Sequence, residues 1–326
     1  MLKFIDFCSG IGGGRLGLEQ NGFRCIGFSE IDKVAIQTYE SLFDTKEPNL
    51  GDLTKISAEK LPDFDVMISG FPCQSFSIVG KREGLANKEK GQIIYHLGKI
   101  LEIKQPRFFI LENVKGIINH DKGKTLKTVL EILEKCNYNV SYEVLNSCDF
   151  SLPQKRERVY FIGIRKDFNQ NFDFSKMQLK HKQNIPKIQD FLTPNEDNLF
   201  EKTLPSYETF LRYLHNKYNL NRFNLKKLLQ EDFLILDTRQ SDLRLYRNTT
   251  PTLRRDRQGI LYVYQKKLYK LSAIEALKLQ GFGTIENLKE KISPLKNTDI
   301  LRQCGNAMSV NVIDTIAKQL LEQCNG

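Results

Sequence analysis

Cys73 is the residue whose position most strongly indicates chemistry. It stands in Gly70-Phe71-Pro72-Cys73-Gln74, between the apolar residues 65–69 and a polar loop. In an open α/β sheet, residues that follow the carboxyl end of a strand lie where such sheets bind ligands. A thiol presented there can act as a nucleophile. The sequence therefore predicts a nucleophilic Cys73, with a buried structural cysteine as the alternative.

Glu112 follows another apolar segment, residues 108–111. We expect its carboxylate at the same sheet edge as Cys73, although a helix cap beginning at Asn113 explains this position equally well.

Basic side chains precede the apolar residues 159–164, in Gln154-Lys155-Arg156-Glu157-Arg158. If this segment is extended, Gln154, Arg156 and Arg158 share one face. A solvated basic strand end is the alternative.

A glycine-rich loop, residues 6–14, separates a short apolar segment from an amphipathic one. Its glycines let a ligand approach the backbone closely, which predicts a nucleotide-like guest, although a tight structural turn uses the same residues. Glu30 follows the next predicted strand, where an acid can accept from ribose hydroxyls. Asp52 lies where an acid can accept from an adenine amino group, or simply cap a turn.

The elements that must hold these residues alternate between strand and helix. Such alternation predicts an α/β fold, a doubly wound and mostly parallel sheet. Strands are predicted at residues 3–7, 25–29, 65–69, 108–111, 140–145 and 159–164, and helices at 15–21, 33–43 and 124–136.

The composition changes after residue 168. Residues 169–235 are rich in Asn, Lys and Gln and include a helical patch at 207–229, and the segment to residue 270 is basic and rich in turns. Helices are again expected at 272–279 and 310–321, and the last of these is apolar enough to need a sheet to cover. We expect one domain at residues 1–168 plus 282–326 and a second, smaller domain at 169–281.

The chain has 326 residues and a net charge of +10, which favours a polyanionic partner or merely a basic protein. Seven scattered cysteines without a C-x-x-C pair indicate reduced thiols and no structural metal. Nothing resembles a membrane span or a signal peptide, so a cytoplasmic protein is expected. Residues 236–270 hold nine basic residues against three acids, and most of these bases are arginines, which suit guanine and phosphate.

Taken together, these segments resemble the DNA cytosine-5 methyltransferase family of bacterial restriction-modification type, over nearly the whole chain except about 169–250. The most specific pieces are Pro72-Cys73-Gln74, Glu112-Asn113-Val114, the 154–158 segment and Gly305-Asn306. The resemblance implies a Rossmann-like fold that binds S-adenosyl-L-methionine, and a recognition domain that faces the larger domain across a DNA cleft. It also implies addition of Cys73 to C6 of a flipped-out cytosine, with support from Glu112, Arg158 and Arg156.

The resemblance also assigns the remaining site residues. For the cofactor they are Phe7, Ser9, Gly10, Ile11, Gly12, Gly13, Glu30, Ile31, Asp52, Leu53, Pro72, Asn306 and Ala307. For DNA they are Ser77, Lys81, Arg82, Arg239, Arg244, Thr252, Arg254, Arg255 and Arg257, with the loop after Cys73 expected to close over the flipped base.

Several residues depart from the family pattern without removing a catalytic group. Cys8 replaces an aromatic residue, Ile31 stands where Trp is common, and Ile274 and Lys278 replace arginines. The expected partner is double-stranded DNA, and no association with a membrane is expected. We expect a monomeric enzyme and a cognate restriction endonuclease in the same system that does not bind the enzyme directly.

Three rivals remain. A tRNA cytosine-5 methyltransferase shares the scaffold, and methyl transfer to duplex DNA and to tRNA separates the two. A dinucleotide-dependent oxidoreductase explains only the glycine loop and Glu30. An inactive DNA-binding module leaves Cys73 and Glu112 without a purpose.

Overall fold

The protein, seen here as a computed structural model, is described for residues 1–72, 92–177, 186–215, 223–239 and 243–325. It divides into two compact units. The first comprises Met1–Asn146, Glu157–Leu179 and Ala307–Gly326, and the second Ser147–Arg156 and Lys180–Asn306. Residues 147–156 and 282–306, which the sequence analysis placed in the first domain, group by their contacts with the second unit.

A six-stranded sheet organises the first unit, in the order β2-β1-β3-β4-β7-β5. Only β7 runs against its neighbours β4 and β5, and the other adjacent pairs are parallel. The strands are β1 (Lys3–Phe7), β2 (Arg24–Ser29), β3 (Val66–Gly70), β4 (Phe108–Val114), β5 (Tyr138–Asn146) and β7 (Glu157–Arg165). The expectation of a doubly wound, mostly parallel α/β sheet is confirmed.

The central strands are buried on both faces. In β1, Phe4, Ile5 and Phe7 are fully buried, and so are Phe109 and Leu111 in β4. A strand covered by helices on both sides has a continuous apolar sequence rather than an alternating one. This burial explains why these short segments are recognisable in the sequence.

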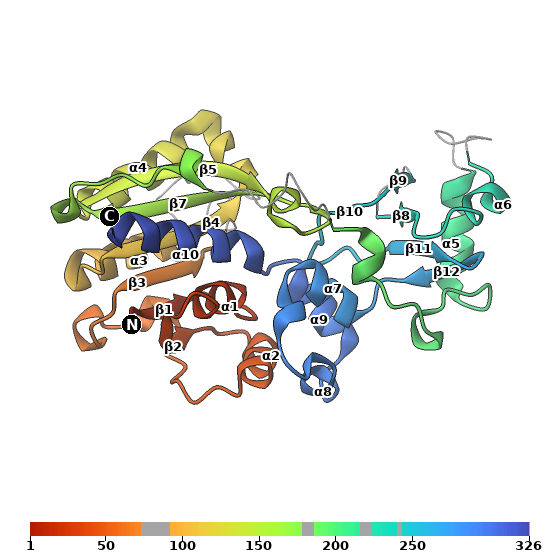
Figure 1. Ribbon diagram of the computed structural model, residues 1–326, viewed down its shortest axis with the longest axis horizontal. Helices are drawn as coiled ribbons and strands as arrows, with labels where there is room; N and C mark the ends of the chain where they lie inside the picture. The colour runs from red at the N-terminus through yellow and green to blue at the C-terminus, as the bar shows by residue number, and fades with distance from the viewer. Residues whose placement is uncertain (73–91, 178–185, 216–222, 240–242, 326) are drawn as a thin grey trace. The chain divides into compact units, whose positions relative to one another are not determined.

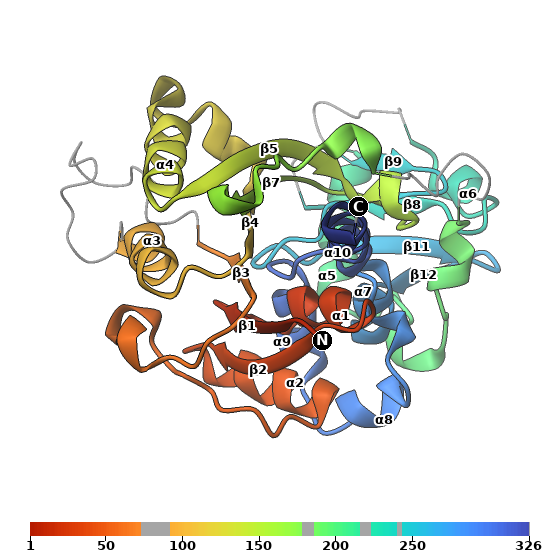
Figure 2. The ribbon, with the colours of Figure 1, turned by 60° about the vertical axis from the view of Figure 1, so that its left-hand side comes forward.

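Helices cover both faces of this sheet. Figure 2 shows α3 and α4 on one side and α1 and α10 on the other. Gly17 of α1 packs so closely on α10 that a Cβ atom there would lie 2.6 Å from Ile313, so the apolar C-terminal helix is packed directly against α1. The helices are α1 (Gly13–Glu19), α2 (Lys33–Phe43), α3 (Gln92–Lys104), α4 (Lys124–Lys135) and α10 (Val310–Asn325).

The second unit is built on an antiparallel sheet, β12-β11-β8-β9, with α5 beside it (Figure 1). Phe210 and Leu214 of α5 pack with Leu236 of β8 and Val263 of β11 in a separate core. The strands are β6 (Gln154–Lys155), β8 (Ile235–Asp237), β9 (Arg244–Tyr246), β10 (Thr250–Pro251), β11 (Ile260–Tyr264) and β12 (Lys267–Lys270). The helices are α5 (Pro205–Leu214), α6 (Leu225–Leu228), α7 (Ala273–Leu279), α8 (Leu288–Ile292) and α9 (Asn297–Cys304).

A buried carboxylate fixes the start of α7. Glu275 is fully buried and accepts hydrogen bonds from the Tyr262 hydroxyl, at 2.8 Å, and from the Thr193 amide, at 2.6 Å. Ser272 and Glu275 also form a capping box, which satisfies backbone groups at the helix start. A buried charge is tolerated when its oxygens are bonded in this way.

Within the described residues, no helix combines the length and the apolar character that a membrane crossing requires.

Candidate functional site

Glu112 and Arg158 form an ion pair at the end of β4. The two atoms Glu112 Oε1 and Arg158 Nε are 3.0 Å apart, and the side chains are only 8% and 14% exposed. The strand register explains the contact, since Arg158 of β7 lies opposite Val114 and so diagonally across from Glu112 on the same face. Two residues 46 positions apart in the sequence therefore form one polar unit in a largely apolar sheet.

Asn113 connects this pair to the segment that leads to Cys73. It is buried, and its side-chain amide donates to the carbonyl of Phe71 at 3.1 Å. Sequence reasoning considered Asn113 only as a helix cap. Its long-range bond becomes visible only when β3 and β4 are side by side.

Cys73, Ser77, Lys81 and Arg82 lie outside the described residues. Their predicted roles remain predictions.

All five described cysteines have a raised pKa and are therefore held as thiols. Burial raises the pKa of Cys8 and Cys25 to about 12 and the pKa of Cys136 and Cys148 to about 11. These groups carry little thiolate at neutral pH and are poor nucleophiles.

The glycine loop is fastened to Glu30. Gly10 N donates to Glu30 Oε2 at 2.9 Å, while Ile31 N and Asp32 N donate to Oε1 at 2.7 and 2.9 Å. The carboxylate thus bridges the ends of β1 and β2. Because each carboxylate oxygen has two lone pairs, Glu30 retains acceptor capacity for a ligand.

The glycines of this loop are needed for different reasons. A Cβ atom at Gly12 would lie 2.3 Å from the Phe43 ring, and one at Gly13 would lie 2.3 Å from the Met308 carbonyl oxygen. These two positions support the structural-turn interpretation. At Gly10, which has a φ of +55°, a Cβ would meet nothing within 4 Å, so the space above that residue is open.

Other predicted cofactor residues differ in their exposure. Phe7, Ile11, Ser9 and Leu53 are buried, so their side chains support the loop from inside. The Ile31 side chain is 69% exposed and so presents an apolar surface beside Glu30.

Asp52 caps a short turn by accepting from the Thr54 amide and hydroxyl, and these bonds lower the pKa of its carboxyl group. The cap that sequence reasoning offered as an alternative is therefore present. The Asp52 side chain is nevertheless 34% exposed.

Pro72, Asn306 and Ala307 lie at the limits of described segments or units. Pro72 is exposed at the last described position before Cys73. Asn306 is exposed and ends the second unit, and the buried Ala307 begins the last segment of the first.

Arg156 is part of a hydrogen-bonded cluster inside the second unit. It is 1% exposed, and its Nη1 donates to the carbonyls of Gly305, at 3.2 Å, and Leu253, at 3.4 Å. Gln154 Oε1 accepts from Leu253 N at 2.9 Å, and Gln154 Nε2 donates to the Leu279 carbonyl. We call these five residues the Arg156 cluster.

The prediction that Gln154, Arg156 and Arg158 share one strand face is wrong. Arg156 N donates to Gln154 O, an i to i+2 bond that marks a turn and not an extended strand. Arg158 belongs to β7 of the first unit, whereas Arg156 belongs to the second. Arg156 thus holds backbone segments together in the second unit.

The predicted DNA contacts fall into two groups. Arg244, Arg254, Arg255 and Arg257 are exposed. Arg239 is a correction, because its side chain is 2% exposed and donates to both Asp237 oxygens and to the Thr252 carbonyl. A guanidinium held in this way orders the adjoining loop and is not available to DNA. The Thr252 hydroxyl is likewise bonded to the Lys155 carbonyl.

Comparison with known proteins shows the family to which this chain belongs. The family described as C-5 cytosine-specific DNA methylase matches residues 2–322. The chain belongs to this family. The methylase is 36% identical over 325 residues to the Type II methyltransferase M.DsaV of Dactylococcopsis salina, covering 98% of this chain and 86% of that protein. It is 35% identical to M1.ScrFI of Lactococcus lactis subsp. cremoris, covering 98% and 78%.

Solved structures agree with the fold of the methylase. The Entamoeba histolytica methyltransferase EhMeth superposes with a TM-score of 0.73 at 20% identity, covering 99% of each chain. The S. pombe Dnmt2 methyltransferase gives a TM-score of 0.70 at 18% identity over the whole of both chains. The family match and the curated relatives show that the methylase is an enzyme, and they confirm the resemblance noted in its sequence.

Proposed function

We propose that this methylase acts on C5 of a cytosine in a specific duplex DNA sequence, as part of a restriction-modification system, with Cys73 as its nucleophile. The observation that carries the proposal is the Glu112–Arg158 ion pair, a carboxylate and a guanidinium fixed 3.0 Å apart at the sheet edge to which the Cys73 segment leads. The Asn113 bond to Phe71 supports it, because it anchors the backbone two residues before Cys73. We further propose that the enzyme acts in the cytoplasm and as a monomer.

In this mechanism the Cys73 thiolate adds to C6 of the cytosine ring, which makes C5 nucleophilic. Glu112 accepts hydrogen bonds from the exocyclic amine and from protonated N3, which favours the electron-poor form of the ring, and Arg158 stabilises the charge that develops near O2. After methylation the C5 proton is lost and Cys73 is eliminated, which restores the aromatic ring. Since none of these atoms is accessible in stacked duplex, the base must be flipped out.

The residues around the glycine loop fit an adenosine-containing cofactor. The open space above Gly10 admits a ligand, Glu30 has acceptor capacity for ribose hydroxyls, and the exposed Ile31 offers an apolar surface for the adenine ring. Asp52, Pro72, Asn306 and Ala307 complete the proposed site. When bound, S-adenosyl-L-methionine supplies an electrophilic methyl group.

We infer that target recognition lies in residues 169–281, most of which belong to the second unit. Its exposed Arg254, Arg255 and Arg257 carry charge without a buried partner, as DNA contact requires. Arg156 then serves recognition by holding the Leu253 backbone and does not touch the substrate.

The test uses duplex DNA that carries 5-fluorocytosine in place of cytosine. Fluorine at C5 blocks the final elimination, so a protein–DNA adduct that depends on S-adenosyl-L-methionine should survive denaturing electrophoresis. Cys73→Ala should abolish both the adduct and methyl transfer, and bisulfite sequencing of treated DNA gives the target site. Methylation by the Cys73→Ala protein would refute the mechanism, and transfer to tRNA but not to duplex DNA would refute the substrate.

A further inference from the structure

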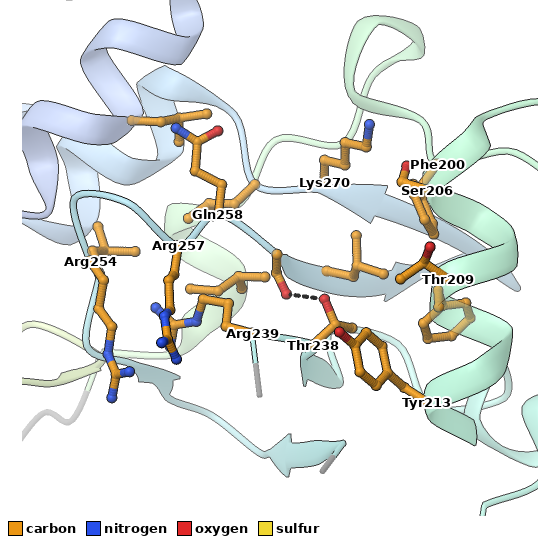
Figure 3. Close-up of a pocket in the computed structure, with 17 residues that line it drawn as sticks. Phe200, Ser206, Thr209, Tyr213, Thr238, Arg239, Arg254, Arg257, Gln258 and Lys270 are labelled. Carbon is orange, nitrogen blue, oxygen red and sulfur yellow. Dashed lines mark hydrogen bonds between the residues drawn. The ribbon is translucent and has the colours of Figure 1, made fainter. Parts of the chain in front are cut away.

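A pocket of about 380 Å³ lies wholly within the second unit. Figure 3 shows its walls: α5 on one side, the strands β11 and β12 beneath, and the loop of residues 253–259 on the other side. This volume lies within the range of small-molecule sites. None of the residues assigned above to base chemistry or to the cofactor lines it.

Cations gather at one end of the pocket. Arg254 and Arg257 line it from the exposed loop, and the charge of the neighbouring Arg239 is neutralised by Asp237. None of the 17 lining residues is acidic. Two arginines without a competing carboxylate favour a phosphate group, which a guanidinium binds in bidentate fashion.

The opposite end is aromatic and hydroxylated. Tyr213, Thr209 and Ser206 come from successive turns of α5, and Phe200 lies close to them (Figure 3). Lys270 also lines the pocket, and its Nζ is 5.3 Å from the centre of the Phe200 ring, which is a cation–π contact. Aromatic side chains with adjacent hydroxyl groups suit a nucleobase, which stacks on the rings and hydrogen-bonds at its edges.

Both ends of the loop of residues 253–259, which we call the arginine loop, are held by hydrogen bonds. The Arg239 guanidinium donates to the Thr252 carbonyl at 2.7 Å, and the Thr238 hydroxyl donates to the Gly259 carbonyl at 2.8 Å. The Arg156 cluster adds a third constraint at Leu253. A loop ordered before binding loses less conformational entropy when a ligand arrives, which raises affinity.

We propose that this pocket binds one nucleoside 5′-phosphate unit, with its phosphate at Arg254 and Arg257 and its base between Tyr213 and Phe200. The unit is either a nucleotide of the DNA strand, other than the target cytosine, or a free mononucleotide. A DNA strand as the source of this nucleotide depends on the proposed function, whereas binding of a free mononucleotide does not.

The chain contains no tryptophan, so Tyr213→Trp introduces a single reporter in the pocket and retains an aromatic side chain. The full-length variant is titrated with each 2′-deoxynucleoside 5′-monophosphate and with the duplex that the enzyme methylates. We expect saturable fluorescence quenching by at least one monophosphate. The matching nucleoside should bind about tenfold to a hundredfold more weakly, because it lacks the charge-assisted bonds to arginine. Calorimetry on the unaltered protein repeats the titration without the reporter.

Arg255→Ala is the matched control for binding of the free monophosphate, since Arg255 belongs to the same exposed loop but does not line the pocket. Duplex binding is not compared in this variant, because the proposed function gives Arg255 a DNA contact. Arg254→Ala with Arg257→Ala should weaken nucleotide binding at least tenfold, while Arg255→Ala should leave it within about twofold. Quenching by duplex as well as by monophosphate assigns the DNA source. Quenching by monophosphate alone assigns the free nucleotide.

Two results would overturn the proposal: no saturable binding in either assay, or an equal loss in Arg255→Ala and in the double variant. Methyl transfer by the unaltered protein, measured in parallel, separates this failure from failure of the proposed function. Methylation without pocket binding removes only the pocket proposal, whereas nucleotide binding without methylation of any DNA removes only the proposed function.

Discussion

Gly305 lies directly against the backbone of Arg255: a Cβ atom on residue 305 would be 2.2 Å from Arg255 N and 2.3 Å from the carbonyl carbon of Arg254. The φ of Gly305 is −63°, which any residue adopts, so only the approach of the loop requires glycine. The segment that ends at Asn306 and the exposed loop of residues 253–259 are therefore packed backbone against backbone.

Gly305→Ala should displace this loop and weaken DNA binding, with a loss of about 1–3 kcal/mol in the free energy of unfolding. Binding to the duplex substrate and denaturant unfolding provide the two measurements. Gly116→Ala is the control, because a Cβ there meets nothing within 4 Å. If Gly305→Ala binds DNA as the wild type does, the proposed coupling of segment and loop is wrong.

The Glu112–Arg158 pair predicts different effects on catalysis and on stability. Glu112→Gln should lower kcat/KM about 10²- to 10⁴-fold, since it removes the carboxylate that interacts with the ring. Arg158→Ala should in addition cost about 3–5 kcal/mol of unfolding free energy, because it leaves a buried charge without its partner. The double variant should recover part of this stability and remain inactive.

Lys115→Ala is the matched control for the stability measurement. Lys115 and Glu157 form an ion pair of the same 3.0 Å length between neighbouring segments, but both side chains are about half exposed. Its removal should cost less than about 1 kcal/mol. Equal losses for Lys115→Ala and Arg158→Ala would show that the burial of the Glu112 pair has no energetic consequence.

Glu30→Gln tests the cofactor site without changing the size of the side chain. The amide replaces one carboxylate oxygen with a donor that faces backbone N–H groups, so the loop at Gly10 should loosen. We expect S-adenosyl-L-methionine affinity to fall about tenfold to a hundredfold in calorimetry, with DNA affinity unchanged. Loss of DNA affinity with intact cofactor binding would reverse the assignment.

Thiol labelling against pH tests the choice of nucleophile. A pKa of about 12 at Cys8 and Cys25, raised first by burial, leaves the thiolate fraction about a thousandfold below that of an ordinary cysteine at pH 8. Because the raised pKa favours the protonated form, labelling of these residues should stay slow from pH 7 to 9 and increase with each step in pH. Iodoacetamide at pH 8 should modify Cys73 first, as read by peptide mapping. Modification of Cys8 at the same rate would contradict its raised pKa.

Local sequence pattern was sufficient to predict the fold class and the positions of the central strands. Strands buried on both faces are mostly apolar, so residues 3–7, in spite of the buried Asp6, and residues 108–111 were recognisable without a structure, and polar residues that follow them had to meet at one sheet edge. For the same reason Glu112 could be placed at this edge from local pattern alone.

Which polar groups contact one another could not be predicted before the fold was known. The bond from Asn113 to Phe71 and the pairing of Glu112 with Arg158 depend on strand order and register, which local sequence does not encode. Arg239 had the same sequence signature as the exposed arginines beside it, and its burial against Asp237 became visible only in the folded second unit. Charge and spacing predict that a side chain takes part in binding or catalysis. The groups that accept its hydrogen bonds come from other parts of the chain and are known only from the fold.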